Sequence, residues 1–262
     1  MNRTLIDISP SEFPQELREY VIKGKIYDSS CSNAAKVYFI DAENGLYLKR
    51  SAKGSLEREA LMTDYFGKIG LGAKVIKYLS DEYDWLLTER VFGEDLIHEE
   101  ALSDPCRLAE FTGKLLRKLH DRDYSDCPIQ NRLSETLEYA ENSMKNGNFS
   151  CDFHIPERFR PSSPEEAWDF VAKNKHLLKE DTLIHGDYCL PNVMAENFNF
   201  TGFIDLGNSG VSDRHFDIFW GAWTLQFNLH TDEYSDIFFD AYGRDKIDFK
   251  ALKTVAYIEC FT

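Results

Sequence analysis

Several features are missing from this chain of 262 residues, and each absence excludes a class of protein. No apolar run approaches the roughly 18 residues of a membrane-spanning helix, so we expect no membrane partner. Segment 1–15 is polar and lacks the hydrophobic stretch of a secretory signal. The six cysteines form no C-x-x-C pair, which in a chain of this size indicates reduced thiols in the cytoplasm rather than a disulfide framework or a zinc site.

The chain also lacks an excess of positive charge. Residues 1–92 contain 13 Lys and Arg against 14 Asp and Glu, and residues 93–262 contain 17 against 31, so the net charge of −15 divides into −1 and −14. A nucleic-acid partner requires a basic surface, so we expect none. The acidic second part would attract a cationic substrate, but acidity also serves solubility alone, and charge by itself does not separate the two roles.

The most informative segment is 183–208, LIHGDYCLPNVMAENFNFTGFIDLGN. It contains the pattern H-G-D-x4-N-x12-D-x-G, in which Asp187 is followed by Asn192 and Asp205. The residues between Asn192 and Asp205 predict two short strands and a polar turn, and this hairpin would bring Asp205 back toward Asp187. In the kinase template the first Asp takes up or orients a hydroxyl proton, while the Asn and the second Asp hold Mg²⁺ on the nucleotide phosphates.

A lysine and a glutamate upstream complete this template. Lys49 lies at the end of the apolar strand 46–49, and Glu59 follows ten residues later in the helical stretch 56–67. In kinases a strand lysine contacts the α- and β-phosphates and pairs with a helix glutamate. Glu57 competes for the glutamate role but would lie on another face of the helix.

The first part of the chain is predicted to be a helix followed by an antiparallel sheet. Apolar and polar residues alternate on both sides of the turn 28–33, which lacks G-x-G-x-x-G but has small hydroxyl residues that can lie over phosphates. Near residues 89–93 an extended backbone would offer hydrogen bonds to an adenine edge, and the charge balance changes there, so we divide the chain into lobes 1–92 and 93–262. The expected elements are a helix over 10–21 capped by Ser11, strands at 26–27, 35–40, 46–49, 75–79 and 83–89, and an Asn-Gly turn at 43–45.

The second part is predicted to be mainly helical. A loop at 146–164, rich in Pro, Asn and Ser, is the most favourable place for an insertion or a lid. The aromatic-rich helix 214–229 is expected to be buried in the core. The expected helices are 94–101, 105–119, 136–145, 164–174 with Ser163 as its cap, 214–229, 231–242 and 249–262.

With these elements in kinase order, the chain resembles the aminoglycoside phosphotransferase family, and the 3′-phosphotransferases fit best. The resemblance implies an α+β, bilobal protein-kinase-like fold with a small antiparallel-sheet N-lobe and a larger, mainly helical C-lobe. It also implies transfer of the ATP γ-phosphoryl group to a hydroxyl of an aminoglycoside antibiotic, here the 3′-hydroxyl, and hence antibiotic resistance. The resemblance covers nearly the whole chain and is most specific in AAKVY (34–38), LYLKR (46–50), LEREALM (56–62), SDCP (125–128), LIHGDYCLPN (183–192) and GFIDLGNSG (202–210).

The resemblance also assigns roles residue by residue. Asp187 resembles the catalytic aspartate, and Asn192 and Asp205 resemble the Mg²⁺ ligands. Tyr47 matches the position whose ring stacks on adenine, and Glu89 matches the hinge backbone. The remaining nucleotide-binding positions are Lys49, Glu59, Val91 of the hinge, and Ser30, Ser32 and Asn33 of the turn.

Amino groups of the substrate would be bound by acidic side chains, and by position these are Asp152, Glu157 and Glu259. The chain departs from the family pattern at its C-terminus, where Glu259 stands alone in place of an adjacent acidic pair and Thr262 follows the usual terminal Phe. Asn208 stands where a relative has arginine. These departures concern the choice of antibiotic and of hydroxyl rather than phosphoryl transfer.

Two other functions are compatible with the same residues. One is a kinase of this fold for a small metabolite such as choline, methylthioribose, homoserine or a fructosamine, and choline would require an aromatic cage. The other is a catalytically inactive kinase-like binding module, although such proteins usually lose the lysine or one of the aspartates that this chain retains. The preference between ATP and GTP, and between a monomer and a homodimer, is left open.

Overall fold

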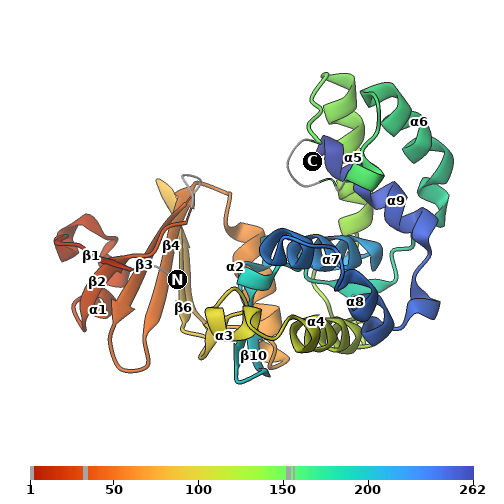
Figure 1. Cartoon of the computed structure of the whole chain (residues 1–262). Helices are drawn as coiled ribbons and strands as arrows, with labels where there is room; N and C mark the ends of the chain where they lie inside the picture. The colour runs from red at the N-terminus through yellow and green to blue at the C-terminus, as the bar shows by residue number, and fades with distance from the viewer. Residues whose placement is uncertain (1–2, 32–34, 152–154, 156) are drawn as a thin grey trace. The chain divides into compact units, whose positions relative to one another are not determined.

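The computed structural model describes residues 3–31, 35–151, 155 and 157–262, and its chain forms two compact units (Figure 1). The N-terminal unit comprises residues 1–95 and 194–207, and the C-terminal unit comprises residues 96–193 and 208–262. The late segment 194–207 therefore folds with the first strands of the chain. The lobe boundary between residues 92 and 93 remains a prediction.

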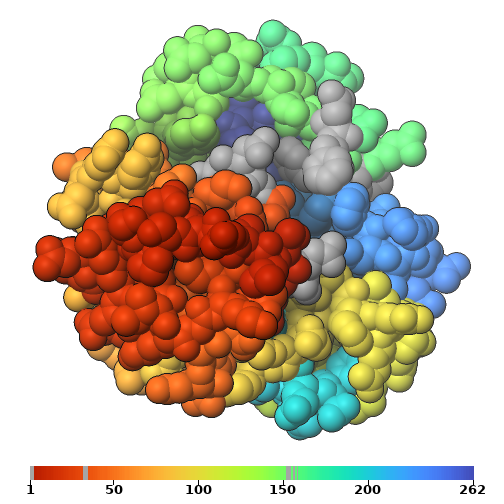
Figure 2. Space-filling view, turned by 90° about the vertical axis from the view of Figure 1, so that its left-hand side faces the viewer, coloured from red at the N-terminus to blue at the C-terminus, as the bar shows by residue number. Residues whose placement is uncertain are grey.

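The N-terminal unit is built on a six-stranded antiparallel sheet with the strand order β1-β2-β3-β4-β6-β5. Figure 2 views the molecule from the side of β1, β2 and α1, whose residues are red and orange. The Asn-Gly turn is confirmed, because the N–H of Gly45 donates to the carbonyl of Ala42 over 2.7 Å. The strands are β1 (Thr4–Leu5), β2 (Lys25–Asp28), β3 (Lys36–Asp41), β4 (Leu46–Ala52), β5 (Val75–Ser80) and β6 (Tyr83–Glu89).

A second, three-stranded sheet completes this unit. The predicted hairpin of two short strands is confirmed: its strands are β9 (Val193–Glu196) and β10 (Asn199–Phe203), and β9 also pairs with β7 (Glu94–Asp95). Helix α2 (Glu57–Lys68) is also where it was expected.

The alternation of side chains along the strands gives the large sheet two different faces. Leu48 is fully buried on one face, where it lies opposite Leu87 of β6. Its neighbour Lys49 lies opposite Leu86, and successive side chains of a strand point to opposite faces, so Lys49 belongs to the other face. That other face is packed against α2, because Leu86 lies in a cluster with Leu56 and Ala60.

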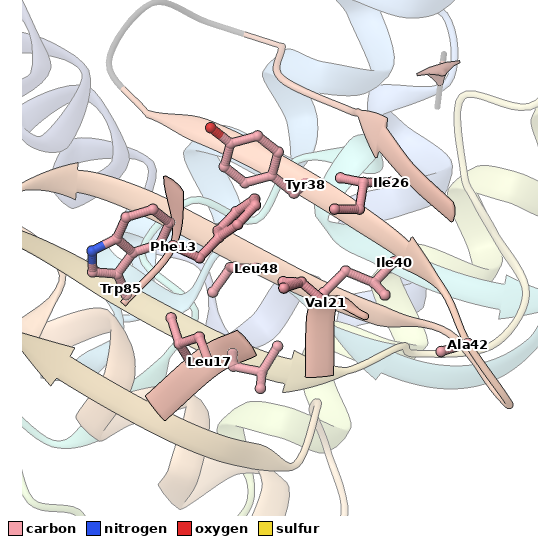
Figure 3. Packing of buried hydrophobic residues seen from close by; sticks show 10 residues of the cluster. Phe13, Leu17, Val21, Ile26, Tyr38, Ile40, Ala42, Leu48 and Trp85 are labelled. Carbon is pink, nitrogen blue, oxygen red and sulfur yellow. The ribbon is translucent and has the colours of Figure 1, made fainter. Parts of the chain in front are cut away.

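The core of the N-terminal unit lies on the Leu48 face (Figure 3). Phe13 packs edge-on against Tyr38, with ring centroids 5.4 Å apart, and also contacts Trp85. Leu17 and Val21 extend this layer and are at most 2% exposed. Full burial of one such side chain stabilises a protein by about 1.5–3 kcal/mol, so the segment before β2 is held by its apolar residues.

The single helix predicted over residues 10–21 is wrong. The segment forms two 3₁₀ helices, η1 (Pro10–Glu12) and η2 (Gln15–Leu17), and one turn of α-helix, α1 (Arg18–Val21). Pro14 lies at the break, because proline lacks the N–H that a continuous helix requires. The cap is Ser9 rather than Ser11, and it forms a capping box with Glu12.

The C-terminal unit is mainly helical, as predicted, with one short two-stranded sheet (Figure 1). Helix α6 begins at its predicted cap, Ser163, whose hydroxyl accepts from the N–H of Glu166. The elements are α3 (Glu99–Leu102), α4 (Pro105–His120), α5 (Arg132–Lys145), η3 (Glu157–Phe159), α6 (Pro164–Asn174), η4 (Lys175–Leu177), β8 (Thr182–Ile184), η5 (Leu190–Asn192), η6 (Leu206–Asn208), β11 (Gly210–Ser212), α7 (His215–Leu229), α8 (Ser235–Tyr242), η7 (Arg244–Lys246), α9 (Phe249–Ile258) and η8 (Glu259–Phe261).

Four helices have boundaries that differ from the sequence prediction. Helix α8 begins at Ser235 rather than at residue 231, and α9 ends at Ile258, after which the chain continues as the 3₁₀ helix η8. The predicted helix 94–101 is wrong in its first half, because Glu94 and Asp95 pair with β9 as strand β7 and the helix starts only after His98. Helix α5 begins at Arg132, four residues before the expected start at Thr136. The amphipathic pattern located α5 but missed its first turn. That turn has no side-chain cap, and its first residue, Arg132, instead bonds to Asn208, 76 positions away.

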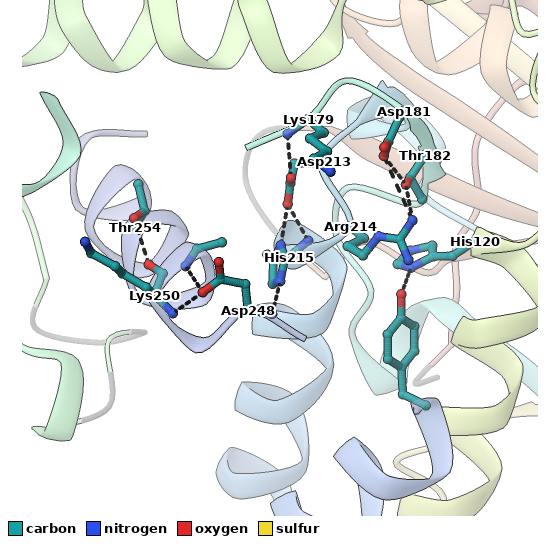
Figure 4. Close-up of polar contacts among 12 residues, drawn as sticks. His120, Lys179, Asp181, Thr182, Asp213, Arg214, His215, Asp248, Lys250 and Thr254 are labelled. Carbon is teal, nitrogen blue, oxygen red and sulfur yellow. Dashed lines mark hydrogen bonds and ion pairs between the residues drawn. The ribbon is translucent and has the colours of Figure 1, made fainter. Parts of the chain in front are cut away.

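The start of α7 is fixed by Asp213 (Figure 4). Its carboxylate accepts from the N–H of Lys179 over 2.7 Å, and from the N–H and Nδ1 of His215 over 2.8 and 2.7 Å. The other ring nitrogen of His215 accepts from the N–H of Asp248 over 2.9 Å. These bonds connect the segment before β8 and the start of α9 to α7.

Every helix among the described residues is too short or too polar to cross a lipid bilayer.

Candidate active site

A pocket in the N-terminal unit collects most of the nucleotide positions that the sequence predicts. It is lined by strands β3, β4 and β6, helix α2 and the segment that follows β10. The predicted residues Tyr47, Lys49, Glu59, Glu89, Val91 and Asp205 all line it. Residues far apart in the sequence therefore meet in one cavity within one unit.

Lys49 is the centre of the polar end of this pocket. Its ammonium group donates to both carboxylate oxygens of Glu59 over 2.8 Å and to Oδ1 of Asp205 over 3.0 Å. The choice between Glu57 and Glu59 is thus settled geometrically in favour of Glu59. Lys49 lies in the middle of β4, not at its end as predicted, so pairing on both sides holds its backbone.

Glu59 owes its position to a buried carboxylate on the sheet. Helix α2 has no local side-chain cap, but Asp84 of β6 accepts from the N–H of Leu56 over 2.8 Å. Asp84 is fully buried and also accepts from the hydroxyls of Tyr78 and Ser80, over 3.0 and 2.6 Å. The start of α2 is therefore fixed to the strand beside β4, which aligns Glu59 with Lys49.

Two carboxylates facing one ammonium shift the acid–base behaviour of the cluster. Burial alone would lower the pKa of Lys49, but the charges of Asp205 and Glu59 outweigh it and the pKa is raised. The pKa of Glu59 is also raised, first by burial and then by Asp205, against the effect of Lys49. Lys49 is therefore a permanent cation, and its Asp205 partner has a side chain that is 54% exposed.

The apolar end of the pocket contains residues that the sequence did not identify. Phe203 and Ile204 line it from β10 and the residues after it, and Met194 lines it from β9. The N–H groups of Glu89 and Arg90 donate to the carbonyls of Lys74 and Gly45, so the backbone at the predicted hinge is held in place. The sequence carried a signal for these lining residues. Segment 193–204 has apolar residues in both strands, and the apolar face of such a hairpin must pack against other parts of the protein.

The predicted phosphate turn is only partly described. Ser30 lies in it, but its hydroxyl accepts from the N–H of Val37 over 2.9 Å and so closes the turn between β2 and β3. Its N–H donates to Asp28, and this bond is the main reason that the pKa of Asp28 is lowered to about 2. Ser32 and Asn33 lie outside the described residues.

The C-terminal unit carries the H-G-D segment immediately after β8. Asn192 donates from Nδ2 to Oδ2 of Asp187 over 2.8 Å and to the carbonyl of Asp187 over 3.0 Å. Gly186, with φ of +82°, makes the sharp turn before Asp187. These two bonds from Asn192, five residues after Asp187, close the loop and fix the orientation of the Asp187 carboxylate.

Asp217 of α7 anchors this loop and was not identified from the sequence. Its two carboxylate oxygens accept from the N–H groups of His185 and Gly186, each over 2.7 Å. Asp217 is fully buried, and a buried carboxylate requires such partners. An acidic residue in the otherwise apolar sequence HFDIFW was the signal that could have revealed it.

A buried histidine supports Asp217 in turn. His120 of α4 donates from Nε2 to Asp217 over 3.1 Å, and its Nδ1 accepts from the hydroxyl of Tyr242 over 2.9 Å. Burial lowers the pKa of His120, so the ring is neutral and the tautomer follows from these two partners. Three helices, α4, α7 and α8, thereby converge on the anchor of the H-G-D segment.

The residues predicted to bind substrate amino groups differ in their surroundings. Glu157 is exposed in η3, whereas Glu259 is buried in η8. Burial raises the pKa of Glu259 to about 7, and Thr262 opposes this by donating to Oε2 over 2.9 Å. Thr262, a departure from the family pattern, thus contacts the expected substrate acid. Asp152 lies outside the described residues.

A strand lysine paired with a helix glutamate in a pocket, together with an Asp–Asn loop in a helical unit, defines the class of kinase-type phosphotransferases. Comparison with known proteins gives the family. Residues 25–253 match the model of the phosphotransferase enzyme family, and the chain belongs to this family.

Named relatives agree with this membership. A probable aminoglycoside 3′-phosphotransferase from Lactococcus lactis subsp. lactis is 46% identical over 255 residues, covering 97% of both chains. An aminoglycoside 3′-phosphotransferase from Enterococcus faecalis is 30% identical over 242 residues, covering 87% of this chain and 90% of its own. A crystal structure of an aminoglycoside-3′-phosphotransferase of type VIII superposes with a TM-score of 0.72 at 23% identity, covering 96% of each chain. The predicted α+β, protein-kinase-like fold class is confirmed.

Proposed function

We propose that this protein is an ATP-dependent phosphotransferase that transfers the γ-phosphoryl group to the 3′-hydroxyl of an aminoglycoside antibiotic and so confers resistance. The Lys49–Glu59–Asp205 cluster carries the phosphoryl-transfer part of this proposal. The acceptor is supported by the 46% identical relative, which is named as an aminoglycoside 3′-phosphotransferase. A solved neighbour described with ADP and streptomycin supports a nucleotide and an aminoglycoside as ligands.

In this proposal the N-terminal unit binds ATP. Tyr47, Glu89 and Val91 lie where they can receive the adenine, and the permanent positive charge of Lys49 holds the α- and β-phosphates. Glu59 keeps the ammonium group at a fixed position, because it accepts from it with both oxygens. Fixed charges of this kind need no reorganisation during the reaction.

The C-terminal unit provides the group that handles the acceptor hydroxyl. Asp187 accepts the hydroxyl proton or orients the hydroxyl, and the bond from Asn192 Nδ2 fixes the carboxylate for this task. Asp205 and Asn192 are the proposed Mg²⁺ ligands; their carboxylate and amide oxygens are the hard donors that this cation prefers. When bound, Mg²⁺ neutralises charge on the phosphates.

The test is a direct assay of phosphoryl transfer. Purified protein is incubated with ATP, Mg²⁺ and, separately, kanamycin, neomycin, choline and methylthioribose, and the product is mapped by NMR. We expect phosphate on the 3′-hydroxyl of kanamycin, and loss of turnover in Asp187→Asn but not in the matched surface variant Asp64→Asn. If only choline or methylthioribose is phosphorylated, the proposed aminoglycoside acceptor is wrong. If Asp187→Asn retains substantial turnover, the catalytic role of Asp187 is refuted.

A further inference from the structure

Arg132, the first residue of α5, makes a two-pronged contact with a residue 76 positions away. Its Nε donates to the backbone carbonyl of Asn208 over 3.1 Å, and its Nη2 donates to Oδ1 of the same residue over 3.2 Å. The side chain is only 22% exposed. A charged donor with two bonds to one residue fixes both the backbone and the side chain of that residue.

The carbonyl that Arg132 holds lies directly against the catalytic loop. A Cβ atom on Gly186 would lie 2.1 Å from the carbonyl oxygen of Asn208, so the two backbones are in close contact there. Gly186 precedes Asp187. The neighbouring backbone is also paired, since Gly210 is in register with Ile184 and Val211 donates to Ile129 over 2.8 Å.

The guanidinium group is also part of the charged surroundings of the proposed acceptor side. Both Arg132 and Asp187 act electrostatically on the carboxyl of Glu259, the arginine lowering its pKa and the aspartate raising it, after the larger effect of burial. Arg132 therefore lies close enough to Glu259 to influence the charge of its carboxyl. Its contact with Asn208 connects α5 to the backbone that lies against the loop carrying Asp187.

We propose that Arg132 is a positioning residue for phosphoryl transfer: by holding Asn208 against Gly186, its guanidinium fixes the orientation of Asp187. This inference rests on the proposed function. The loop is clamped on two sides, by Asp217 through the N–H groups of His185 and Gly186, and by Arg132 through Asn208. Loss of the second clamp lets Asp187 move without unfolding the helices, so kcat falls while the binding of ATP in the N-terminal unit is unchanged.

The test compares four variants with the wild-type enzyme by steady-state kinetics and thermal unfolding. Arg132→Gln removes the charge and the two-pronged guanidinium contact, and Arg132→Lys keeps the charge but cannot form both bonds. Asn208→Ala removes Oδ1 but keeps the backbone carbonyl, so it breaks only one of the two bonds from Arg132. Lys145→Gln is the matched control, because Lys145 is an exposed cation at the other end of α5 that pairs with Glu141 over 2.7 Å.

We expect Arg132→Gln to lower kcat for kanamycin roughly 10- to 100-fold, since a displacement of about 1 Å at a reacting group can cost about 100-fold. The KM for ATP should stay within about twofold, and Arg132→Lys should be intermediate because a lysine cannot reproduce the two-pronged contact. Asn208→Ala should lose less kcat than Arg132→Gln because the bond to the carbonyl remains, and Lys145→Gln should match the wild type.

Other results would overturn the inference. If Arg132→Gln retains full kcat, Arg132 is a helix tether and not a positioning residue. The same conclusion holds if its loss of kcat is explained by the fraction of protein unfolded at the assay temperature and Asn208→Ala behaves as the wild type. A wild-type enzyme that is inactive on every acceptor would instead refute the proposed function, and this inference with it.

Discussion

Lys49 is the residue whose substitution should affect the nucleotide most. It carries one positive charge between the carboxylates of Glu59 and Asp205. Lys49→Met leaves these two carboxylates together without a cation and removes the charge for the phosphates. We expect kcat/KM for ATP to fall about 100-fold or more, as when one transition-state donor is removed from an active site.

The measurement is the ATP dependence of turnover, with Lys53→Met as the control because Lys53 is exposed just beyond the end of β4. The control should behave as the wild type. Equal losses in both variants would mean that the effect is not specific to the Glu59–Asp205 cluster.

Glu259 should make the stability of the protein depend on pH. Its pKa rises on folding from 4.5 to about 7, mainly through burial. The unfolded chain therefore binds fewer protons than the folded protein between these values, so the stabilising effect of the protonated carboxyl is complete below 4.5 and is lost as the pH rises through 7. A shift of this size corresponds to about 3 kcal/mol in the free energy of unfolding.

The prediction is checked by urea unfolding at about pH 5 and about pH 8. Relative to Glu259→Gln, the wild type should lose about 3 kcal/mol over this interval. Glu157→Gln is the control, since Glu157 is exposed and should leave the pH dependence of the wild type unchanged. Parallel pH profiles for the wild type and Glu259→Gln would contradict the assignment.

At the scale of elements, the H-G-D segment depends on the contact between α4, α7 and α8. Asp217→Asn replaces one acceptor oxygen by an NH₂ group, which then faces an N–H of His185 or Gly186. We expect a loss of about 3–5 kcal/mol in the free energy of unfolding, as for other broken buried charge networks. Turnover should fall with it, because the backbone next to Asp187 loses its anchor.

Tyr242→Phe is the graded comparison in the same network. It removes only the hydroxyl that donates to His120 Nδ1, so it should cost about 1–2 kcal/mol and leave most of kcat. Denaturant unfolding and steady-state kinetics of both variants distinguish the role of Asp217, which binds the loop directly, from that of Tyr242, which acts through His120. Equal losses of kcat in the two variants would show that Asp217 has no special effect on the loop.

The sequence correctly predicted those strands and helices that are determined by neighbouring residues in the chain. Alternation and the Asn-Gly turn located β2, β3 and β4, the core-facing period located α4, and the Ser163 cap located α6. The predicted helix over 10–21 is absent because Pro14 lacks the N–H that a continuous helix requires. The start of the helix near residue 94 failed because Glu94 and Asp95 pair with β9, a partner about a hundred residues later that no local pattern reveals.

The same distinction holds for the candidate site. Lys49 and Glu59 could be identified because their spacing and order match the phosphoryl-transfer template, and the contact between them is present. For Asp217 the only local signal is an acid in an otherwise apolar stretch, and Arg132 has no local signal, because their roles depend on bonds to residues 31 and 76 positions away. The burial of Glu259, which decides its pKa, is likewise a property of the folded chain.

At the scale of the whole molecule, charge is distributed very unequally along the chain. Residues 93–262 carry a net charge of −14 and residues 1–92 only −1. The summed field of an acidic region raises the rate at which a cationic ligand arrives, and salt screens this field over about 10 Å at 0.1 M. An aminoglycoside carries several ammonium groups, so its capture should depend strongly on salt, whereas the capture of ATP should not benefit from this field.

Raising NaCl from about 0.02 M to about 0.3 M should therefore lower kcat/KM for kanamycin about tenfold or more, because steering contributes about 10- to 1000-fold to association rates. An N-acetylated aminoglycoside with fewer charges serves as the control acceptor and should show a weaker salt dependence. The two acceptors share the enzyme and the ATP, so any general effect of salt on the protein cancels in their ratio. A ratio that does not change with salt would mean that the acidity serves solubility, and that the acceptor is selected by short-range contacts alone.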